Sequence, residues 1–349
     1  MILGANSARG RRVLANVLSC CILVLVFVEF VRLDLPLARF VRSLHVPWLE
    51  RIGDTAGMVG SGGALVAFSA LLLAAGLLHR RPIMRRAGVQ SLVAHGLSAL
   101  LAQVLKHGIG RPRPRLMHAD AGFGWHPSLQ VGLDSFPSGH ATASFAVATV
   151  LAKYFPAVAG MVYGAAGLIG VSRVVRGSHY PTDVLGGVWL GIVVGYLVVH
   201  PLREWKRVIP EVFLMLVPYG LAAFGVLSLI VHFPPADTRT IGMLAGGATL
   251  ILAGMAMRGY VSAWGAHDAR LRSSADRLIV FGLGAVTASW MLTALAGALC
   301  LVHDFGMAEA GEPSNPRPIS SSPILTELSL VPVPVLLAFL QLNGQPATL

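Results

Sequence analysis

The chain has 349 residues, of which 55% are hydrophobic and 12% charged, and its mean hydropathy is +0.70. Soluble globular proteins carry about 25% charged residues, so this composition excludes an ordinary soluble domain and indicates a polytopic membrane protein. The net charge of +11 and the isoelectric point near 10.4 are better explained by membrane topology than by nucleic acid, and we expect no nucleic-acid partner.

The first residues contain three arginines, Arg9, Arg11 and Arg12, ahead of a long apolar run at residues 14–32. This arrangement is similar to a secretory signal peptide, but the run is long and no small-residue cleavage site follows it. We therefore expect a retained first membrane helix.

Further apolar stretches have the length of about 20 residues that one helical span requires. They lie at residues 56–79, 88–106, 139–155, 157–175, 182–200, 211–232, 240–262 and 278–302. A tenth stretch, 324–343, contains Glu327, Pro332 and Pro334, so it could be kinked, half-buried or interfacial. The expected fold class is an all-α polytopic membrane protein.

We expect two regions. Residues 1–207 would form a six-span core, and residues 208–349 an appended C-terminal membrane region with three to four more spans. The appended region could assist substrate access, form a homodimer or modify specificity. Small-xxx-small spacing predicts close helix packing at two groups of glycines: Gly187, Gly191 and Gly195, and Gly242 and Gly246.

Basic residues cluster in three of the expected loops. If the spans alternate, these loops share the side of the N-terminal arginines, which the positive-inside rule makes cytoplasmic. The clusters are Arg80, Arg81, Arg85 and Arg86; Arg203, Lys206 and Arg207; and Arg258, Arg270, Arg272 and Arg277. The opposite side has basic residues that topology does not explain and for which we expect a function: Lys106, Arg111, Arg113, Arg115, Arg173 and Arg176.

Three segments should meet on that outer side. The segment KHGIGRPRPR (106–115) ends the third span, because Pro112 and Pro114 stop the helix. In SFPSGHATAS (135–144), Ser138 suits a helix N-cap, so the backbone N–H groups that follow can bind an anion. In SRVVRGSHYPTDVLGG (172–187), His179 and Asp183 are four residues apart and could share a helix face.

Together these residues suit phosphoryl transfer. Cations hold the charged oxygens, an imidazole held by a carboxylate can act as nucleophile, and a second histidine, His140, can act as acid. His179 and Asp183 could instead ligate a metal, but no carboxylate-rich set completes such a site. The three cysteines, Cys20, Cys21 and Cys300, lie in apolar runs and form neither a disulfide framework nor a metal-finger pattern.

At these residues the sequence resembles the type-2 phosphatidic acid phosphatase (lipid phosphate phosphatase) family. The family signature reads lysine, six residues, Arg-Pro; then Pro-Ser-Gly-His; then Ser-Arg, five residues, His, three residues, Asp. Every signature position matches, at Lys106, Arg113, Pro114, Pro137, Ser138, Gly139, His140, Ser172, Arg173, His179 and Asp183.

The resemblance covers residues 1–207 and implies a role for each matching residue. It implies that His179 forms a phosphohistidine, that Asp183 orients it, and that His140 protonates the leaving group and then activates water. The implied phosphate ligands are Lys106, Arg113, Ser138, Gly139 and Arg173. No metal or other cofactor is implied.

The implied function is hydrolysis of a lipid phosphomonoester or pyrophosphate in the cell membrane, in bacteria the inner membrane, with the site facing the periplasm or exterior. The substrates that fit are isoprenoid diphosphates such as undecaprenyl diphosphate, phosphatidylglycerol phosphate, phosphatidate and lipid A phosphates, and family analogy favours a bacterial isoprenoid carrier. One alternative is a lipid phosphotransferase that uses the same intermediate. A vanadate-dependent haloperoxidase is disfavoured because those proteins are soluble, and a transporter or scramblase with a vestigial site is disfavoured by the intact signature.

Overall fold

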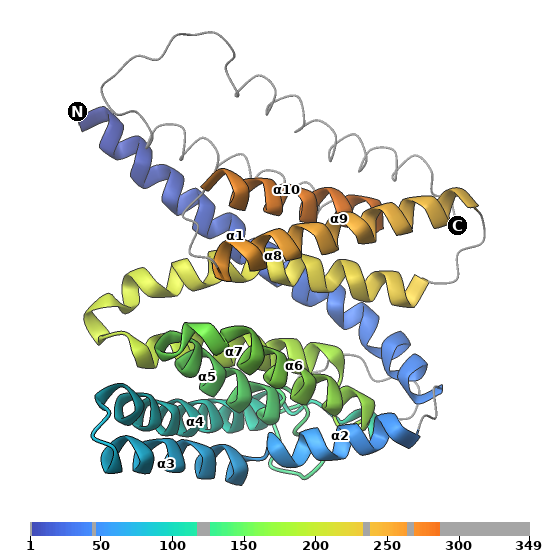
Figure 1. Cartoon of the computed structure of the whole chain (residues 1–349). Coiled ribbons are helices and arrows are strands. Elements are labelled where there is room, and N and C mark those ends of the chain that lie inside the picture. The colour runs from blue at the N-terminus through green and yellow to red at the C-terminus, as the bar shows by residue number, and fades with distance from the viewer. Residues whose placement is uncertain (1, 44–46, 117–125, 233–237, 264–268, 287–349) are drawn as a thin grey trace. The chain divides into compact units, whose positions relative to one another are not determined.

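The computed structural model describes residues 2–43, 47–116, 126–232, 238–263 and 269–286. Within these residues the secondary structure is helical and no strand is present (Figure 1). Four of the described helices are long and apolar enough to cross a membrane, or five if one bent pair counts as a span. The chain is therefore an all-α polytopic membrane protein, as expected. The C-terminal part of the expected span 278–302 and the whole of 324–343 lie outside the described residues.

The chain divides into two compact units. One unit comprises residues 27–212, and the other comprises residues 1–26 together with 213–349. Two long helices, α1 (Ile2–Ser43) and α8 (Trp205–His232), contribute residues to both units. The expected boundary at residue 207 lies close to the end of the first unit, but separate roles for the two regions stay a prediction.

The unit of residues 27–212 is built around a central helix, α5 (Gly139–Tyr154), which packs against α4 (Pro82–Ile109), α6 (Ala159–Val175) and α7 (Pro181–Val199). Its buried core includes small and branched residues that let the helices approach closely: Ala94, Ala146, Val150 and Val194. Short 3-10 turns, η1 (Pro114–Leu116), η2 (Pro156–Val158) and η3 (Leu202–Glu204), lie in the connections.

Close packing of α7 on α5 depends on the predicted glycines. A Cβ atom at Gly191 would lie 2.4 Å from the carbonyl oxygen of Thr142, and one at Gly195 would lie 2.5 Å from Cβ of Thr149. Real Cβ atoms do not approach other atoms so closely, so these positions hold the two helix backbones together. The predicted packing role is confirmed for the glycines of α7.

The expected second span is not one straight helix. Residues 56–59 end α2 (Pro47–Val59), and α3 (Gly62–Leu78) begins after a break, at an angle of 48°. The side chain of Ser61 accepts a hydrogen bond from the backbone N–H of Ala64 at 3.3 Å and so starts a new helix. The stretch 56–79 is therefore a bent pair of helices and not one continuous helix. Hydropathy does not detect such a cap, and the pair together still counts as one candidate span.

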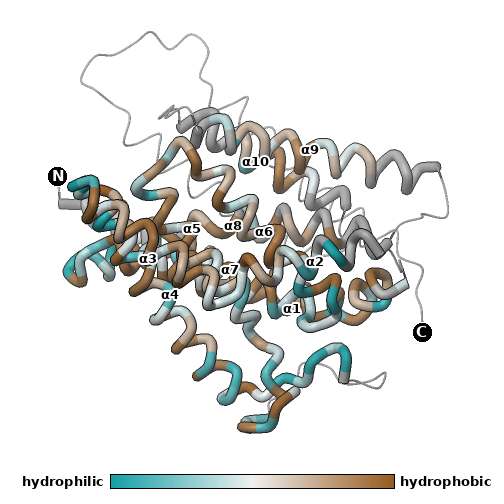
Figure 2. The backbone as a smooth tube through the Cα atoms, turned by 60° about the horizontal axis from the view of Figure 1, so that its bottom comes forward, coloured by the Kyte–Doolittle hydropathy of each residue, from teal (hydrophilic) through white to brown (hydrophobic). Residues whose placement is uncertain are grey.

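In the other unit, α9 (Thr238–Ala263) packs against α10 (Ala269–Val286). The contact glycine of α9 is Gly254, where a Cβ atom would lie 2.6 Å from the carbonyl oxygen of Ala275, whereas one at Gly246 would meet nothing within 4 Å. Packing through Gly246 is thus not observed among the described residues. Along the described helices apolar residues predominate (Figure 2).

Candidate active site

Within residues 27–212, the end of α4 and the starts of α5 and α7 carry the three sequence segments to one place. Gly110 ends α4 in the left-handed conformation (φ 67°), and a Cβ atom there would lie 1.5 Å from the carbonyl oxygen of His126. The backbone N–H of Ser138 donates to the carbonyl oxygen of Asp183 at 2.8 Å. This bond ties the start of α5 to the first turn of α7.

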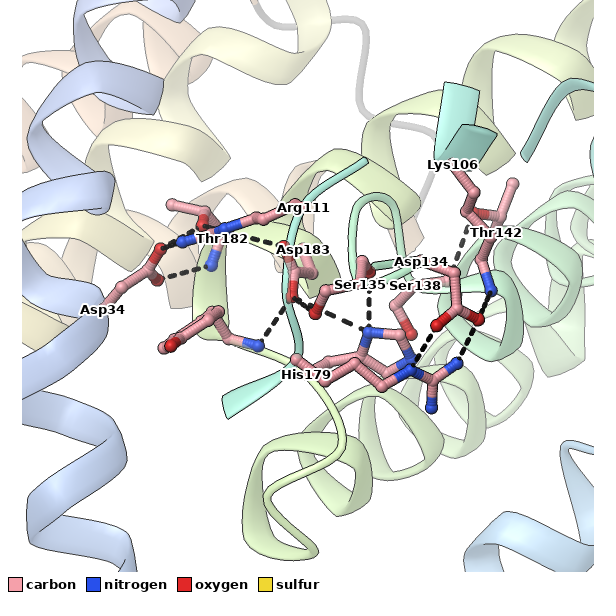
Figure 3. Close-up of polar contacts among 12 residues, drawn as sticks. Asp34, Lys106, Arg111, Asp134, Ser135, Ser138, Thr142, His179, Thr182 and Asp183 are labelled. Atoms are coloured by element: carbon pink, nitrogen blue, oxygen red, sulfur yellow. Dashed lines mark hydrogen bonds and ion pairs between the residues drawn. The ribbon is translucent and has the colours of Figure 1, made fainter. Parts of the chain in front are cut away.

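His179 is buried in the loop before α7, and a contact at its Nδ1 atom holds the ring in place (Figure 3). Its Nδ1 lies 2.8 Å from the backbone carbonyl oxygen of Ser135. Because a carbonyl oxygen only accepts hydrogen bonds, Nδ1 must carry the proton, and Nε2 keeps its lone pair. Burial lowers the pKa of His179 below its ordinary value, although the nearby charge of Asp183 opposes this shift. The site therefore favours a neutral imidazole with a free Nε2.

Asp183 is fully buried, but it does not hold His179 by a direct hydrogen bond. Its Oδ2 lies 3.7 Å from Nδ1 of His179, which is ion-pair but not hydrogen-bond distance. The carboxylate instead accepts from the hydroxyl of Ser135 at 2.5 Å and from the backbone N–H of Tyr180 at 2.7 Å. Because His179 precedes the helix, the two residues do not share a helix face as the spacing had suggested.

A buried arginine, Arg111, connects Asp183 to the first helix. It donates to Oδ1 of Asp183 at 2.6 Å and to Oδ2 of Asp34 at 2.6 Å, and its guanidinium lies 4.3 Å from the centre of the Tyr180 ring. Burial opposes its charge, but Asp183 and Asp34 raise the pKa of Arg111 above its ordinary value. Asp34 also accepts from the backbone N–H of Thr182 at 2.9 Å. A network of one arginine and two carboxylates thus fixes the first turn of α7.

A second acidic residue, Asp134, gathers two of the predicted phosphate ligands. Arg113 donates to it through Nε at 2.8 Å and through Nη2 at 2.6 Å, and Nζ of Lys106 lies 3.7 Å from Oδ2. Burial alone would raise the pKa of Asp134, but Arg113 and Lys106 outweigh it and lower the pKa to about 2. Both cations are therefore preorganised around one carboxylate.

The start of α5 offers a hydroxyl donor that no group in the described part of the chain uses. Ser138 is the N-cap residue by position, but its side chain makes no capping bond, and its buried hydroxyl has no hydrogen-bond partner among the described residues. Gly139 is the first residue of the helix, and a Cβ atom there would lie 3.8 Å from Nζ of Lys106. His140, the next residue, is partly exposed and interacts electrostatically with Arg173 and His179. An anion could bind here to the hydroxyl, the N–H groups and the lysine together.

Arg173, in the last turn of α6, is buried. Its Nε and Nη2 donate to the hydroxyl of Ser172 at 3.0 and 2.9 Å, and Nη2 also donates to the carbonyl oxygen of Gly53 in α2 at 3.1 Å. All eight predicted site residues thus lie in one unit, around the starts of α5 and α7 and the ends of α4 and α6. Their chemical roles are not tested by this placement.

Sequence reasoning missed the residues that support the site: Asp34, Asp134, Ser135, Tyr180 and Thr182. Arg111 is one of the basic residues that topology does not explain, but the sequence indicates no partner for it. Asp34 carried the clearest signal, because an ionisable residue in a membrane helix is rare and usually functional. It was overlooked because the expected span ended at residue 32, whereas the structure continues α1 to Ser43.

Comparison with known proteins identifies the family of the chain. Residues 87–207 match the PAP2 superfamily. Phosphatidylglycerophosphatase B of Bacillus subtilis is 33% identical over 166 residues, which are 44% of this chain and 76% of that protein. The chain belongs to the PAP2 superfamily. The PAP2 match contains all eight predicted site residues, whereas Asp34 and α2 lie outside it.

Other relatives match this chain over shorter stretches or with lower sequence identity. Lipid A 1-phosphatase of Rhizobium etli is 40% identical over 95 residues, which are 27% of this chain and 41% of that protein. The match therefore spans about two fifths of that relative's length. The crystal structure of Aquifex aeolicus LpxE is 28% identical, with a TM-score of 0.39 over 48% of this chain and 94% of that one.

Proposed function

We propose that the chain is a membrane phosphatase that hydrolyses a lipid phosphomonoester or pyrophosphate through a phosphohistidine at His179. The observation that carries this proposal is the hydrogen bond between Nδ1 of His179 and the carbonyl oxygen of Ser135. It leaves Nε2 unprotonated and nucleophilic, at a place where cations and unused donors converge. The PAP2 relatives, named as phosphatases of phosphatidylglycerophosphate and of lipid A, support the same reaction class.

In the first step Nε2 attacks phosphorus, forming a P–N bond while the P–O bond to the lipid breaks. Burial and the neighbouring charge of Arg173 lower the pKa of His140 to about 4, so the negative charge of the bound phosphate must first raise it. Protonated His140 then gives its proton to the departing oxygen. The negative charge on the three other phosphoryl oxygens is stabilised by the proposed phosphate ligands: Lys106, Arg113, Ser138, Gly139 and Arg173. Asp183, 3.7 Å from Nδ1, stabilises the positive charge that His179 acquires as it is phosphorylated.

In the second step water replaces the lipid. His140, now neutral, takes a proton from the water as its oxygen attacks phosphorus, and the P–N bond breaks to release inorganic phosphate. The same histidine therefore serves as acid and then as base. If an acceptor hydroxyl took the place of water, the protein would be a phosphotransferase. Release of phosphate without an acceptor lipid would exclude this alternative.

The decisive experiment combines turnover with trapping of the intermediate. Purified full-length protein is given a panel of lipid phosphates, including phosphatidate, phosphatidylglycerol phosphate, undecaprenyl diphosphate and lipid A, and phosphate release is measured. With a ³²P-labelled substrate, rapid quenching should trap an acid-labile, alkali-stable label on the wild-type protein. We expect the His179→Ala protein to carry no label. Its turnover should be at least ~100-fold slower than that of the wild type. Turnover near wild type in His179→Ala would refute the mechanism.

Metal independence is a further part of this proposal. The cationic pocket should also accept orthovanadate, a mimic of the trigonal-bipyramidal transition state. We expect activity to survive chelators and to fall with orthovanadate. Loss of activity on chelation, with recovery on adding a divalent ion, would instead identify a metal site.

A further inference from the structure

The guanidinium of Arg173 lies against α2, a helix that contributes none of the predicted site residues. Nη2 donates to the carbonyl oxygen of Gly53, and both Nε and Nη2 donate to the neighbouring Ser172. The arginine is 5% exposed, so its position depends on what surrounds it. The surface of α2 is therefore part of what places this cation.

Gly57, one turn after Gly53, leaves the space that the guanidinium occupies. A Cβ atom at Gly57 would lie 2.0 Å from Nη2, 2.8 Å from Cζ and 3.0 Å from Nη1 of Arg173. The three nearest atoms all belong to one guanidinium. Gly57 lies inside α2 and has no positive φ, so its backbone conformation does not require glycine. The absence of a side chain matters here because of Arg173.

We propose that Gly57 is a positioning residue for the phosphate site. Because Gly57 has no side chain, this face of α2 leaves room for the guanidinium of Arg173 at the position from which it binds phosphate. This inference rests on the proposed function. An arginine binds phosphate through a planar fork with fixed directions, so a shift of the guanidinium weakens the contact. Arg173 also interacts electrostatically with His140, which places it beside the proposed acid.

The atoms of Arg173 that a methyl group at Gly57 would meet predict the effect of a Gly57→Ala substitution. They are the far end of a flexible side chain, so the arginine can move while α2 and α6 keep their packing. The Gly57→Ala variant should therefore fold but bind phosphate poorly. At Gly60, by contrast, a Cβ atom would lie 2.3 Å from Cγ2 of Ile169, a core side chain, so Gly60→Ala should cost stability instead.

The test compares full-length variants in detergent micelles, with dioctanoyl phosphatidic acid as the substrate probe. A second measurement, the rise in thermal midpoint that inorganic phosphate causes, reports binding without turnover. Four changes are compared: Gly57→Ala, Gly60→Ala, Arg173→Ala and the Gly57→Ala/Arg173→Ala pair. Gly63→Ala is the neutral control, because a Cβ atom there would meet nothing within 4 Å.

We expect Gly57→Ala to raise KM, and to lower the affinity for inorganic phosphate, by at least about tenfold, the loss usual for one charge-assisted hydrogen bond. Its thermal midpoint without phosphate should match that of Gly63→Ala. In the double variant Gly57→Ala should add no further loss to that of Arg173→Ala, because the cation it displaces is already absent. Gly60→Ala should lower the midpoint with an unchanged KM.

Each other outcome is distinguishable. A fully active Arg173→Ala would overturn the phosphate-binding role in the proposed function. An impaired Arg173→Ala beside a normal Gly57→Ala would overturn only the present inference, as would losses that multiply in the double variant. If Gly57→Ala fails to accumulate, recovery of folded protein in the double variant would support the contact, and failure of both would show a purely structural glycine.

Discussion

At the residue scale, Asp34 supports the site from the first helix. Its carboxylate accepts hydrogen bonds from Arg111 and from the backbone of Thr182, and Arg111 in turn holds Asp183. None of these groups needs to touch the substrate. Their shared effect is to hold Asp183 charged and in place behind His179.

Replacing Asp34 by Asn should therefore lower both stability and turnover. The amide removes one of two charges that compensate Arg111, and breaking a buried ion pair costs about 3–5 kcal/mol. Thermal unfolding in detergent and kcat would measure the two effects. Glu29→Gln is the comparison on the same helix: Glu29, whose side chain is 19% exposed, pairs with a largely exposed Arg32 and not with a buried partner, so the change should cost less. An Asp34→Asn protein with wild-type stability and kcat would contradict the role of the network.

The buried imidazole of His179 predicts the pH dependence. Its neutral form is the nucleophile, so kcat falls as pH drops through the pKa of His179. Because burial lowers this pKa below its ordinary value, the acid limb should lie below that of a free imidazole, about pH 6.5. In Asp183→Asn the carboxylate no longer raises this pKa, so the residual activity should show a limb at still lower pH. The same substrate is used for both proteins, so its own ionisation cancels; an unmoved or upward-shifted limb would contradict the assignment.

At the scale of elements, the contact between α5 and α7 determines where both site helices begin. The glycines of α7 bring its backbone against Thr142 and Ala146 of α5, and the bond from Ser138 to Asp183 joins the two helix starts. A change in this packing would therefore move Asp183, which supports the proposed nucleophile His179, relative to the proposed acid His140.

Gly191→Ala should destabilise the protein by about 1–3 kcal/mol, the usual cost of overpacking a core. The new Cβ atom would lie 2.4 Å from the carbonyl oxygen of Thr142, which is backbone and cannot rotate away. Gly167→Ala in α6 is the control, because a Cβ atom there would meet nothing within 4 Å. Thermal midpoints in detergent would decide, and equal midpoints for the two variants would contradict the packing role.

At the scale of the whole molecule, the basic loops predict that the site faces away from the cytoplasm. In a background with Cys20, Cys21 and Cys300 replaced, a cysteine at Val131, which is 96% exposed, should react with a membrane-impermeant maleimide on intact cells. A cysteine at the exposed Arg81 should react only after permeabilisation. The reverse labelling pattern would place the site on the cytoplasmic side and overturn the proposed orientation.

The division into two units predicts the outcome of a truncation. A protein that ends after Val212 keeps every residue of the site network, and it should hydrolyse a short-chain phosphatidate. Activity on a long-chain lipid should fall if the removed helices line the lateral path to the site. Size-exclusion chromatography and circular dichroism would first establish that the truncated protein is folded. A folded but inactive protein would show that the C-terminal region belongs to the catalytic unit.

The sequence by itself determined the membrane class, most helix positions and the identity of the matching PAP2 residues. Hydropathy along 20-residue stretches and prolines or caps at helix ends are local properties, so they are readable without a structure. The break between α2 and α3 escaped this reading because hydropathy does not register the two-residue interruption at Gly60 and Ser61 or the cap that Ser61 provides.

Only the tertiary structure decided which groups support the site residues. The partner of His179 is a carbonyl 44 positions earlier, Asp34 reaches Thr182 across 148 positions, and Arg173 contacts a helix 120 positions away. A backbone carbonyl and an empty glycine face have no pattern in the sequence. Asp34 stands out as an ionisable residue in a membrane helix, but its partners come from where the packed helices place it.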